Sequence, residues 1–376
     1  MATDANAQQV DGGTMTAGAR VYLDFAATAP LDPAAAAAMA AWSGRAANPS
    51  SVHAEGRAAR AALEAARAEI ATALGWRGEV ILTSGGTEAI RLGVEGARRV
   101  LVSAVEHAAV LGAVPRAGVI PVDAGGRVRL NALAAMLAEG GPALVAVQQG
   151  NNETGVVQPL AQVASLVRAQ GGLLLADCVQ SAGRMALPDA DFIAVSAHKL
   201  GGPAGCGALL VRDLGLLSPR IGGGQERGYR PGTENWLGAI AWASAMRARA
   251  ADAGWSERAA ALRDRAEAAM VAAGGRVIGG EGERLPHISC VALPGVDAQL
   301  QLMALDLEGF AVSAGAACSS GRVRASHVLT AMGISERAAG EAIRVSVGWT
   351  TAADGIDRFA AAYARMAGRL AARSAA

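Results

Sequence analysis

Residues 195–202, Val195-Ser196-Ala197-His198-Lys199-Leu200-Gly201-Gly202, contain the only lysine in a chain of 376 residues. The chain has 34 lysines and arginines, so 33 of its basic residues are arginines. Arginine keeps its proton in proteins, whereas a lysine in a dry pocket or among other cations can become a neutral amine nucleophile. Two interpretations of Lys199 follow: an amine used in chemistry, or a surface lysine that codon bias spared by chance. Composition alone favours neither.

Length and composition indicate a globular protein with a large domain and a smaller one. At 37.7 kDa the chain can bury a sizeable core, and its mean hydropathy of +0.27 comes mostly from alanine. It contains no run of about 18 bulky apolar residues, and Asp4 and Asp11 lie where a signal peptide would be apolar. We therefore expect a cytoplasmic protein with no membrane span. A net charge of +1 and 3% aromatic residues argue against DNA or RNA binding.

The four cysteines do not suggest a metal site. Cys178, Cys206, Cys290 and Cys318 form no C-x-x-C pair and no metal-like spacing with the histidines. In a reducing compartment the first three, which lie in or beside apolar runs, are expected to be small buried hydrophobic residues. Cys318 lies among small residues without an apolar period, a composition that favours an accessible loop and a thiol able to ionise.

Short apolar runs alternate with helical stretches along most of the chain. The runs occupy residues 80–83, 100–103, 119–122, 144–148, 173–176, 192–196 and 208–211. This alternation predicts an α/β fold with a mostly parallel seven-stranded sheet covered by helices on both faces. We expect a disordered lead-in at 1–19, a large domain at 20–250 and a small α+β domain at 251–376, on which some N-terminal residues pack. In the small domain, strands are expected near 288–292, 310–313 and 343–347.

Polar residues follow several of these runs, so they should meet at one rim of the sheet. Residues 83–87 read Thr-Ser-Gly-Gly-Thr between a strand and a predicted helix, where backbone N–H groups can hold a phosphate, although an ordinary glycine turn is equally compatible. Asp177 ends a buried strand, and either a protonated ring nitrogen or a helix N-terminus would satisfy its carboxylate. Together with Lys199 these groups supply what pyridoxal phosphate requires: an anchor, an acid and a Schiff-base amine.

Further motifs agree with this combination. In chain order they are Tyr22-Leu23-Asp24, Gly85-Gly86-Thr87-Glu88, Glu106-His107, Asn151-Asn152-Glu153-Thr154-Gly155, Asp177 with Gln180, Ser196-Ala197-His198-Lys199, Gly222-Gly223-Gly224-Gln225-Glu226-Arg227, Arg230-Pro231-Gly232-Thr233, Ala316-Ala317-Cys318-Ser319-Ser320-Gly321 and Arg344. With these motifs the chain, from about residue 21 to 347, resembles the cysteine desulfurases (NifS/IscS-like), a group within the class V aminotransferase family of fold-type I pyridoxal-phosphate enzymes.

The resemblance implies a role for individual residues. Lys199 would form the Schiff base with pyridoxal 5'-phosphate, Asp177 would pair with the ring nitrogen, and Gln180 would bond the ring hydroxyl. His107 would stack on the ring and take part in catalysis. Further positions would hold the phosphate, namely Gly86, Thr87, Ser196 and His198, with Thr233 reaching the cofactor of the neighbouring subunit in a homodimer. Asn152 and Arg344 would bind the substrate carboxylate, although Arg344 could instead be an ion-paired strand residue.

Cys318 separates desulfuration from transamination in this comparison. The resemblance implies that Lys199 removes a proton from L-cysteine and that Cys318 attacks the substrate sulfur. The products would be L-alanine and a persulfide on Cys318, which passes sulfur to an acceptor protein for iron-sulfur clusters, or to tRNA or other cofactors. A selenocysteine lyase or an aminotransferase on the same fold, and a non-catalytic sulfur carrier, are the alternatives. The motifs leave the sulfur acceptor open.

Overall fold

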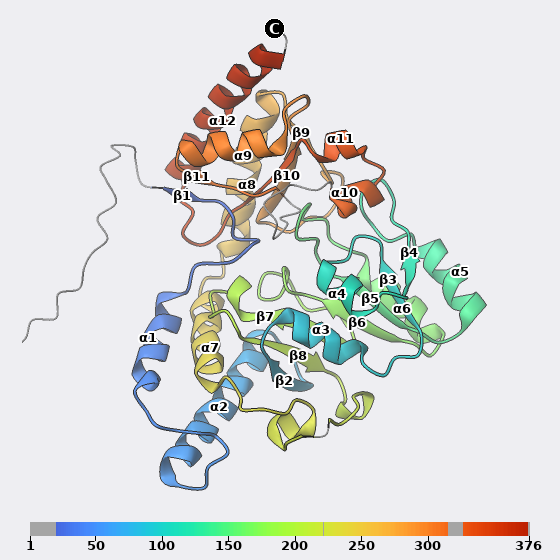
Figure 1. The fold of residues 1–376 in the computed structure, drawn as a ribbon, viewed down its shortest axis with the longest axis vertical. Coiled ribbons are helices and arrows are strands. Elements are labelled where there is room, and N and C mark those ends of the chain that lie inside the picture. The colour runs from blue at the N-terminus through green and yellow to red at the C-terminus, as the bar shows by residue number, and fades with distance from the viewer. Residues whose placement is uncertain (1–19, 221, 315–325, 375–376) are drawn as a thin grey trace, which may run out of the picture.

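The computed structural model describes residues 20–220, 222–314 and 326–374 (Figure 1). The predicted lead-in at 1–19 and the predicted loop around Cys318 lie outside these residues.

A mixed, mostly parallel sheet forms the centre of the larger region. Its order is β2-β8-β7-β6-β5-β3-β4, and β8 alone runs antiparallel to its two neighbours. The prediction of a seven-stranded, mostly parallel sheet is therefore confirmed within the described residues. The strands are β2 (Glu79–Thr83), β3 (Val100–Ser103), β4 (Gly118–Ile120), β5 (Leu144–Gln148), β6 (Leu173–Asp177), β7 (Phe192–Ser196) and β8 (Gly207–Val211).

Both faces of this sheet are buried because apolar residues occupy consecutive positions of its strands. Val145 and Val147 face one hydrophobic core, whereas Leu144 and Ala146 face the other. The first core includes residues of α2 (Ala54–Ala73), α5 (Leu130–Gly140), α6 (Leu160–Ala169) and α7 (Trp236–Ala250), and the second includes residues of α3 (Gly86–Val94) and α4 (Ala108–Ala113). Helices thus cover the sheet on both sides, which leaves the carboxyl ends of the parallel strands as an open edge.

The chain after α7 builds a second, smaller layer with its own core. A three-stranded sheet of order β12-β10-β9 packs against α8 and α12, around Val291, Ile343 and Phe359. The elements are α8 (Trp255–Ala272), β9 (Arg276–Val277), β10 (Ile288–Ala292), α9 (Ala298–Leu307), β11 (Phe310–Ala311), α10 (His327–Ala331), α11 (Glu336–Ala339), β12 (Ala342–Ser346) and α12 (Ala353–Ser374). The division at residues 250 and 251 stays a prediction.

The N-terminal segment joins the two layers. β1 (Val21–Tyr22) pairs in parallel with β11, and Leu23 belongs to the core of the smaller layer. The chain then crosses to the large sheet, where Asp32 caps α1 (Pro33–Ser43) by accepting from the Ala34 N–H at 2.9 Å. Residues 23–32 therefore lie between the layers. Within the described residues no helix combines the length and the apolar character that a membrane crossing needs.

Candidate active site

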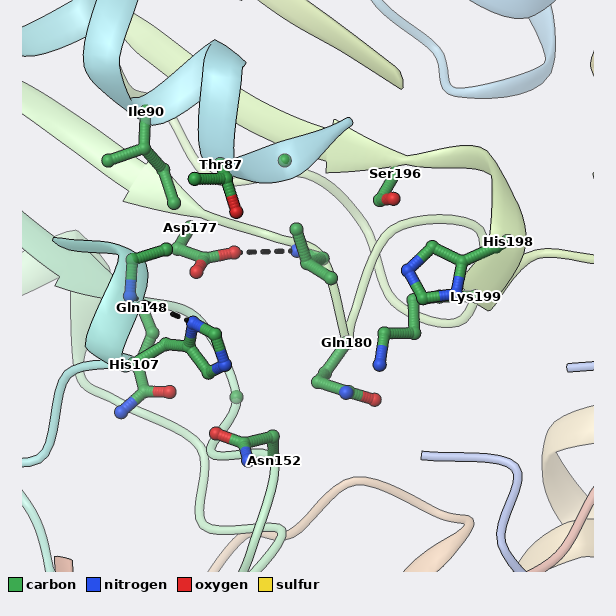
Figure 2. A pocket seen from close by; sticks show the side chains of 14 residues that line it. Thr87, Ile90, His107, Gln148, Asn152, Asp177, Gln180, Ser196, His198 and Lys199 are labelled. Atoms are coloured by element: carbon green, nitrogen blue, oxygen red, sulfur yellow. Dashed lines mark hydrogen bonds between the residues drawn. The ribbon is translucent and has the colours of Figure 1, made fainter. Parts of the chain in front are cut away.

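A cavity of about 260 Å³ lies at the carboxyl ends of the parallel strands (Figure 2). Loops that follow β2, β3, β5, β6 and β7 each contribute side chains to it. Nine of the predicted site residues line this cavity: Gly86, Thr87, His107, Asn152, Asp177, Gln180, Ser196, His198 and Lys199. Gln148, Gly150, Ile90, Ala109 and Val179 complete its wall.

Two of the predicted residues that the structure describes do not line this cavity. Arg344 is on β12 and donates to the backbone of Asn152 in the cavity wall, and Thr233 lines a separate cavity of about 50 Å³ beside Ser84 and Arg230. Cys318 lies outside the described residues.

Lys199 follows β7 in a short 3₁₀ turn, Ala197–Lys199, and its amine points to the segment between the layers. Nζ donates to the carbonyl oxygens of Ala26 and Ala27, both at 2.6 Å. Burial, together with the charges of Arg344 and Arg184, lowers the pKa of Lys199 to about 8. Roughly a tenth of this amine is therefore neutral at pH 7, far more than for an ordinary surface lysine.

Arg184 holds the backbone under the lysine in place. Its guanidinium donates to the carbonyl oxygen of Lys199 at 2.6 Å and to that of Gln180 at 2.8 Å. A single guanidinium thereby fixes the spacing of two cavity loops. The sequence carried no signal for this residue, because Arg184 is one of many arginines and belongs to no recognised motif.

Asp177 is the last residue of β6, Gln180 lies in the turn that follows, and both line the cavity. Asp177 Oδ1 accepts from the Val179 N–H at 2.9 Å, so the carboxylate caps a turn, and no helix begins there. Burial raises the pKa of Asp177, while the Val179 N–H and the charges of His107 and Lys199 oppose that rise. Gln180 donates through Nε2 to Ala26 O at 2.8 Å, and its buried Oε1 has no partner among the described residues. Both side chains thus present free acceptor capacity.

The turn after β2 contributes Gly86 and Thr87, at the start of α3, to the cavity wall. α3 begins at Gly86 without a side-chain cap, so backbone N–H groups of its first turn are open to a ligand. A Cβ on Gly86 would lie 2.7 Å from Val179 Cγ2, so the cavity needs glycine at this position. Opposite this turn, burial and the Lys199 charge lower the pKa of His198 to about 4. The imidazole is consequently neutral and can donate one hydrogen bond.

His107 projects into the cavity from the start of α4 (Figure 2). Its Nδ1 accepts from the Ala109 N–H at 3.1 Å, which leaves Nε2 to carry the ring proton. Directly before it, Glu106 is fully buried, and Oε1 accepts from the Gln148 N–H at 2.7 Å. Burial and the nearby Asp177 carboxylate raise the pKa of Glu106 well above its usual value. The sequence marked Glu106 as part of a motif but gave no indication that its carboxyl would be buried with a raised pKa.

Arg344 sits where the smaller layer meets the cavity. Its guanidinium forms an ion pair with Asp24 Oδ1 at 2.7 Å and donates to Asn152 O at 2.8 Å, while the buried Nε has no described partner. The predicted ion pair therefore exists, and the guanidinium also retains a free donor beside Asn152. Of the cysteines, Cys178, Cys206 and Cys290 are buried as predicted.

Comparison with known proteins adds independent information. The model of the family Aminotransferase class-V matches residues 21–359. A cysteine desulfurase of Cereibacter sphaeroides is 41% identical over 365 residues, covering 90% of this chain and 93% of the relative. Among solved structures, a NifS-like protein from Rickettsia africae superposes with a TM-score of 0.86 at 31% identity, covering 92% and 99% of the two chains. The structure titled SspA in complex with cysteine superposes with a TM-score of 0.76 at 26% identity, covering 87% and 99%.

Proposed function

We propose that this chain, which belongs to the class V aminotransferase family, is a cysteine desulfurase that removes sulfur from L-cysteine and releases L-alanine. Members of this family depend on pyridoxal phosphate. The observation that carries the proposal is the cavity in which the only lysine of the chain meets a buried acid and an open helix N-terminus. The relative from Cereibacter sphaeroides bears the name cysteine desulfurase over nearly the same length.

The residues around the cavity fit pyridoxal phosphate. The open N-terminus of α3 with Thr87, Ser196 and neutral His198 suits the phosphate. Asp177 would pair with the pyridine nitrogen, and the unpartnered Gln180 Oε1 suits the ring hydroxyl. His107 projects into the same space and would stack on the ring. When bound, the cofactor withdraws electrons from the substrate Cα and so weakens the bonds at that carbon.

The chain's own groups would handle the substrate and its protons. Lys199, whose pKa is lowered to about 8, would hold and return the proton of the substrate Cα. Arg344 would bind the substrate carboxylate through its free Nε, with the Asn152 side chain beside it. Asp177 would keep the ring nitrogen protonated, because a buried carboxylate without a strong counter-ion binds a nearby cation firmly.

Cys318 would accept the sulfur. A bond between the Cys318 sulfur and the substrate sulfur forms as the Cβ–S bond of the substrate breaks. The electrons of the broken bond stay with the substrate carbon, which is then protonated to give L-alanine. The resulting persulfide would supply an acceptor protein for iron-sulfur clusters, or tRNA or cofactor thiolation, in the cytoplasm. We also propose a homodimer, since Thr233 lies outside the cavity of its own chain and would reach the cavity of a second copy.

Replacing Cys318 by serine tests this proposal directly. The Cys318→Ser variant should keep the visible absorbance of bound cofactor and lose cysteine-dependent sulfide release. Lys199→Ala is the matched control that should lose the covalent absorbance as well. Unchanged sulfide release by Cys318→Ser would overturn the assignment. The same assay with L-selenocysteine decides between a desulfurase and a selenocysteine lyase.

A further inference from the structure

An acidic residue lies at the anion-binding end of α3. Glu88 is in the first turn of the helix, directly after Thr87, and its Oε2 accepts from the Ser84 N–H at 2.6 Å. Burial would raise the pKa of Glu88, but the Ser84 N–H and the Arg230 guanidinium outweigh it and lower the pKa, so the group is ionised. A carboxylate there stabilises the helix but repels a second anion bound at the N–H groups of the same turn. A phosphate held by this turn therefore needs a compensating cation.

Arg230 supplies that cation. Its Nε lies 3.1 Å from Glu88 Oε1, and the two side chains are only 21% and 29% exposed. Partial burial weakens solvent screening, so the pair affects an anion nearby more than a fully exposed pair would. Arg230 lies between residues 222 and 235, a segment that contacts the large sheet but contributes no residue to the wall of the main cavity.

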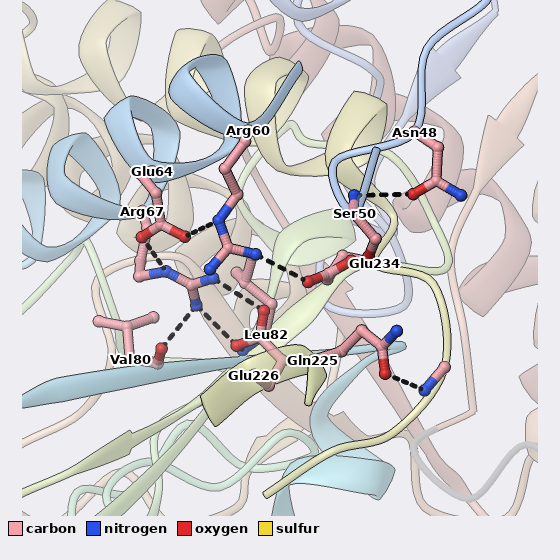
Figure 3. A network of polar contacts seen from close by, with 11 residues as sticks. Asn48, Ser50, Arg60, Glu64, Arg67, Val80, Leu82, Gln225, Glu226 and Glu234 are labelled. Atoms are coloured by element: carbon pink, nitrogen blue, oxygen red, sulfur yellow. Dashed lines mark hydrogen bonds and ion pairs between the residues drawn. The ribbon is translucent and has the colours of Figure 1, made fainter. Parts of the chain in front are cut away.

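A buried ion pair fixes this segment in an unusual backbone conformation (Figure 3). Glu226 and Arg227 have φ angles of 45° and 57°, and among the described residues they are the non-glycine positions with positive φ. The Glu226 side chain is 0% exposed, and its two oxygens accept hydrogen bonds from the two terminal nitrogens of Arg67, at 2.6 and 2.8 Å. Such a backbone persists only where surrounding contacts hold it.

The same carboxylate also connects the segment to the sheet. Glu226 Oε2 accepts from the backbone N–H of Leu82 at 2.7 Å. Leu82 is on β2, the edge strand that leads directly into the turn at residues 83–86. Glu226 therefore joins the segment to β2, and Arg230 joins it to α3.

We propose that Arg230 is a positioning residue for the phosphate of the cofactor: it neutralises Glu88 at the N-terminus of α3, and the Arg67–Glu226 pair holds its segment in place to do so. The inference rests on the proposed function in that the ligand of this turn is a phosphate. Arg230 itself touches neither cofactor nor substrate in this account. It acts only through Glu88, so its loss should affect binding of a phosphate-bearing ligand and should be offset by removal of the Glu88 charge, which a general structural role would not predict.

The test compares ligands with and without a phosphate on the full-length chain freed of cofactor. Binding of pyridoxal 5'-phosphate and of pyridoxal is followed by absorbance for wild type, Arg230→Gln, Glu88→Gln and the double variant. Arg230→Gln should weaken binding of pyridoxal 5'-phosphate about 2- to 30-fold, the range expected for a charge at a helix terminus, and leave binding of pyridoxal unchanged. Adding Glu88→Gln should restore most of that loss, because the uncompensated charge is then gone.

Two further variants keep the test decisive. Arg220→Gln removes a guanidinium that pairs with Glu95 at the opposite end of α3, so it should change neither ligand's affinity. Arg230→Lys keeps the cation and should bind nearly as wild type, which covers the case in which Arg230→Gln does not fold.

An equal loss for both ligands, or a double variant no better than Arg230→Gln, would overturn the inference. A wild-type chain that binds pyridoxal as tightly as its phosphate would instead count against the proposed function. Inorganic phosphate should compete with the cofactor in wild type and compete less well in Arg230→Gln.

Discussion

Replacing Glu226 by glutamine should destabilise the protein far more than loss of an ordinary surface ion pair. The glutamine oxygen can replace one carboxylate oxygen, but its NH₂ group would face the Arg67 guanidinium, donor against donor. The Glu226 carboxylate accepts three hydrogen bonds, two from Arg67 and one from the Leu82 N–H, and the glutamine cannot keep all three. Removing one partner of a buried ion pair costs about 3–5 kcal/mol. In the variant, Arg67 still has its ion pair with Glu64, whose side chain is 40% exposed, at 3.1 Å. We therefore expect the free energy of unfolding to decrease by about 3 kcal/mol, the lower end of that range.

Urea unfolding of the cofactor-free chain, followed by circular dichroism, measures this loss. Arg227→Gln is the matched control: it removes the next residue's exposed ion pair with Glu79, side chains 45% and 42% exposed, and should cost about 0–1 kcal/mol. The double variant Arg67→Met with Glu226→Met should recover part of the stability, since it removes the uncompensated buried charge but leaves the Leu82 N–H without its acceptor. A loss below about 1 kcal/mol for Glu226→Gln would refute the role given to this pair.

Three further predictions concern pH and packing. The rate at which the cofactor-free chain takes up pyridoxal phosphate should rise with pH and level off above about 8, where Lys199 is neutral; a rise that continues to 10.5 would contradict the lowered pKa. His287 is fully buried, and burial first, then the Arg184 charge, lowers its pKa well below 6.5. As the pH falls, this imidazole is therefore protonated in the unfolded chain before it is protonated in the folded one. As the pH is lowered from 6.5, the free energy of unfolding should therefore decrease, and it should decrease less for His287→Phe. If denaturation at several pH values shows the same decrease for both proteins, His287 is not the cause. Gly86→Ala should weaken pyridoxal phosphate binding by about 1–3 kcal/mol because its Cβ meets Val179, whereas Gly44→Ala, with no atom within 4 Å, should bind as wild type; equal affinities would show that the turn can yield.

The large sheet could be predicted from the sequence because each strand leaves an uninterrupted apolar run. A strand such as β5 buries both faces, and polar residues begin where its run ends. The position of Asp177 at the end of β6 and of Lys199 after β7 then follows from the rule that parallel strands present their carboxyl ends at one edge.

Contacts between distant segments could not be predicted in the same way. β1 pairs with β11 over two residues per strand, which is too short for any periodicity. Arg344 pairs with Asp24 across most of the chain, and no local pattern indicates this. The left-handed backbone at Glu226 contradicts local preference, since glycine is the residue expected at positive φ. In each case a tertiary contact decides the outcome.

The products formed from L-cysteine test the central claim most directly. The cofactor-loaded wild-type chain is incubated with L-cysteine and a thiol reductant, and alanine, sulfide and keto acids are quantified together. The account predicts equal amounts of L-alanine and sulfide, and neither product from Lys199→Ala. Formation of the keto acid that still carries the cysteine sulfur, without alanine, would contradict it and identify an aminotransferase instead.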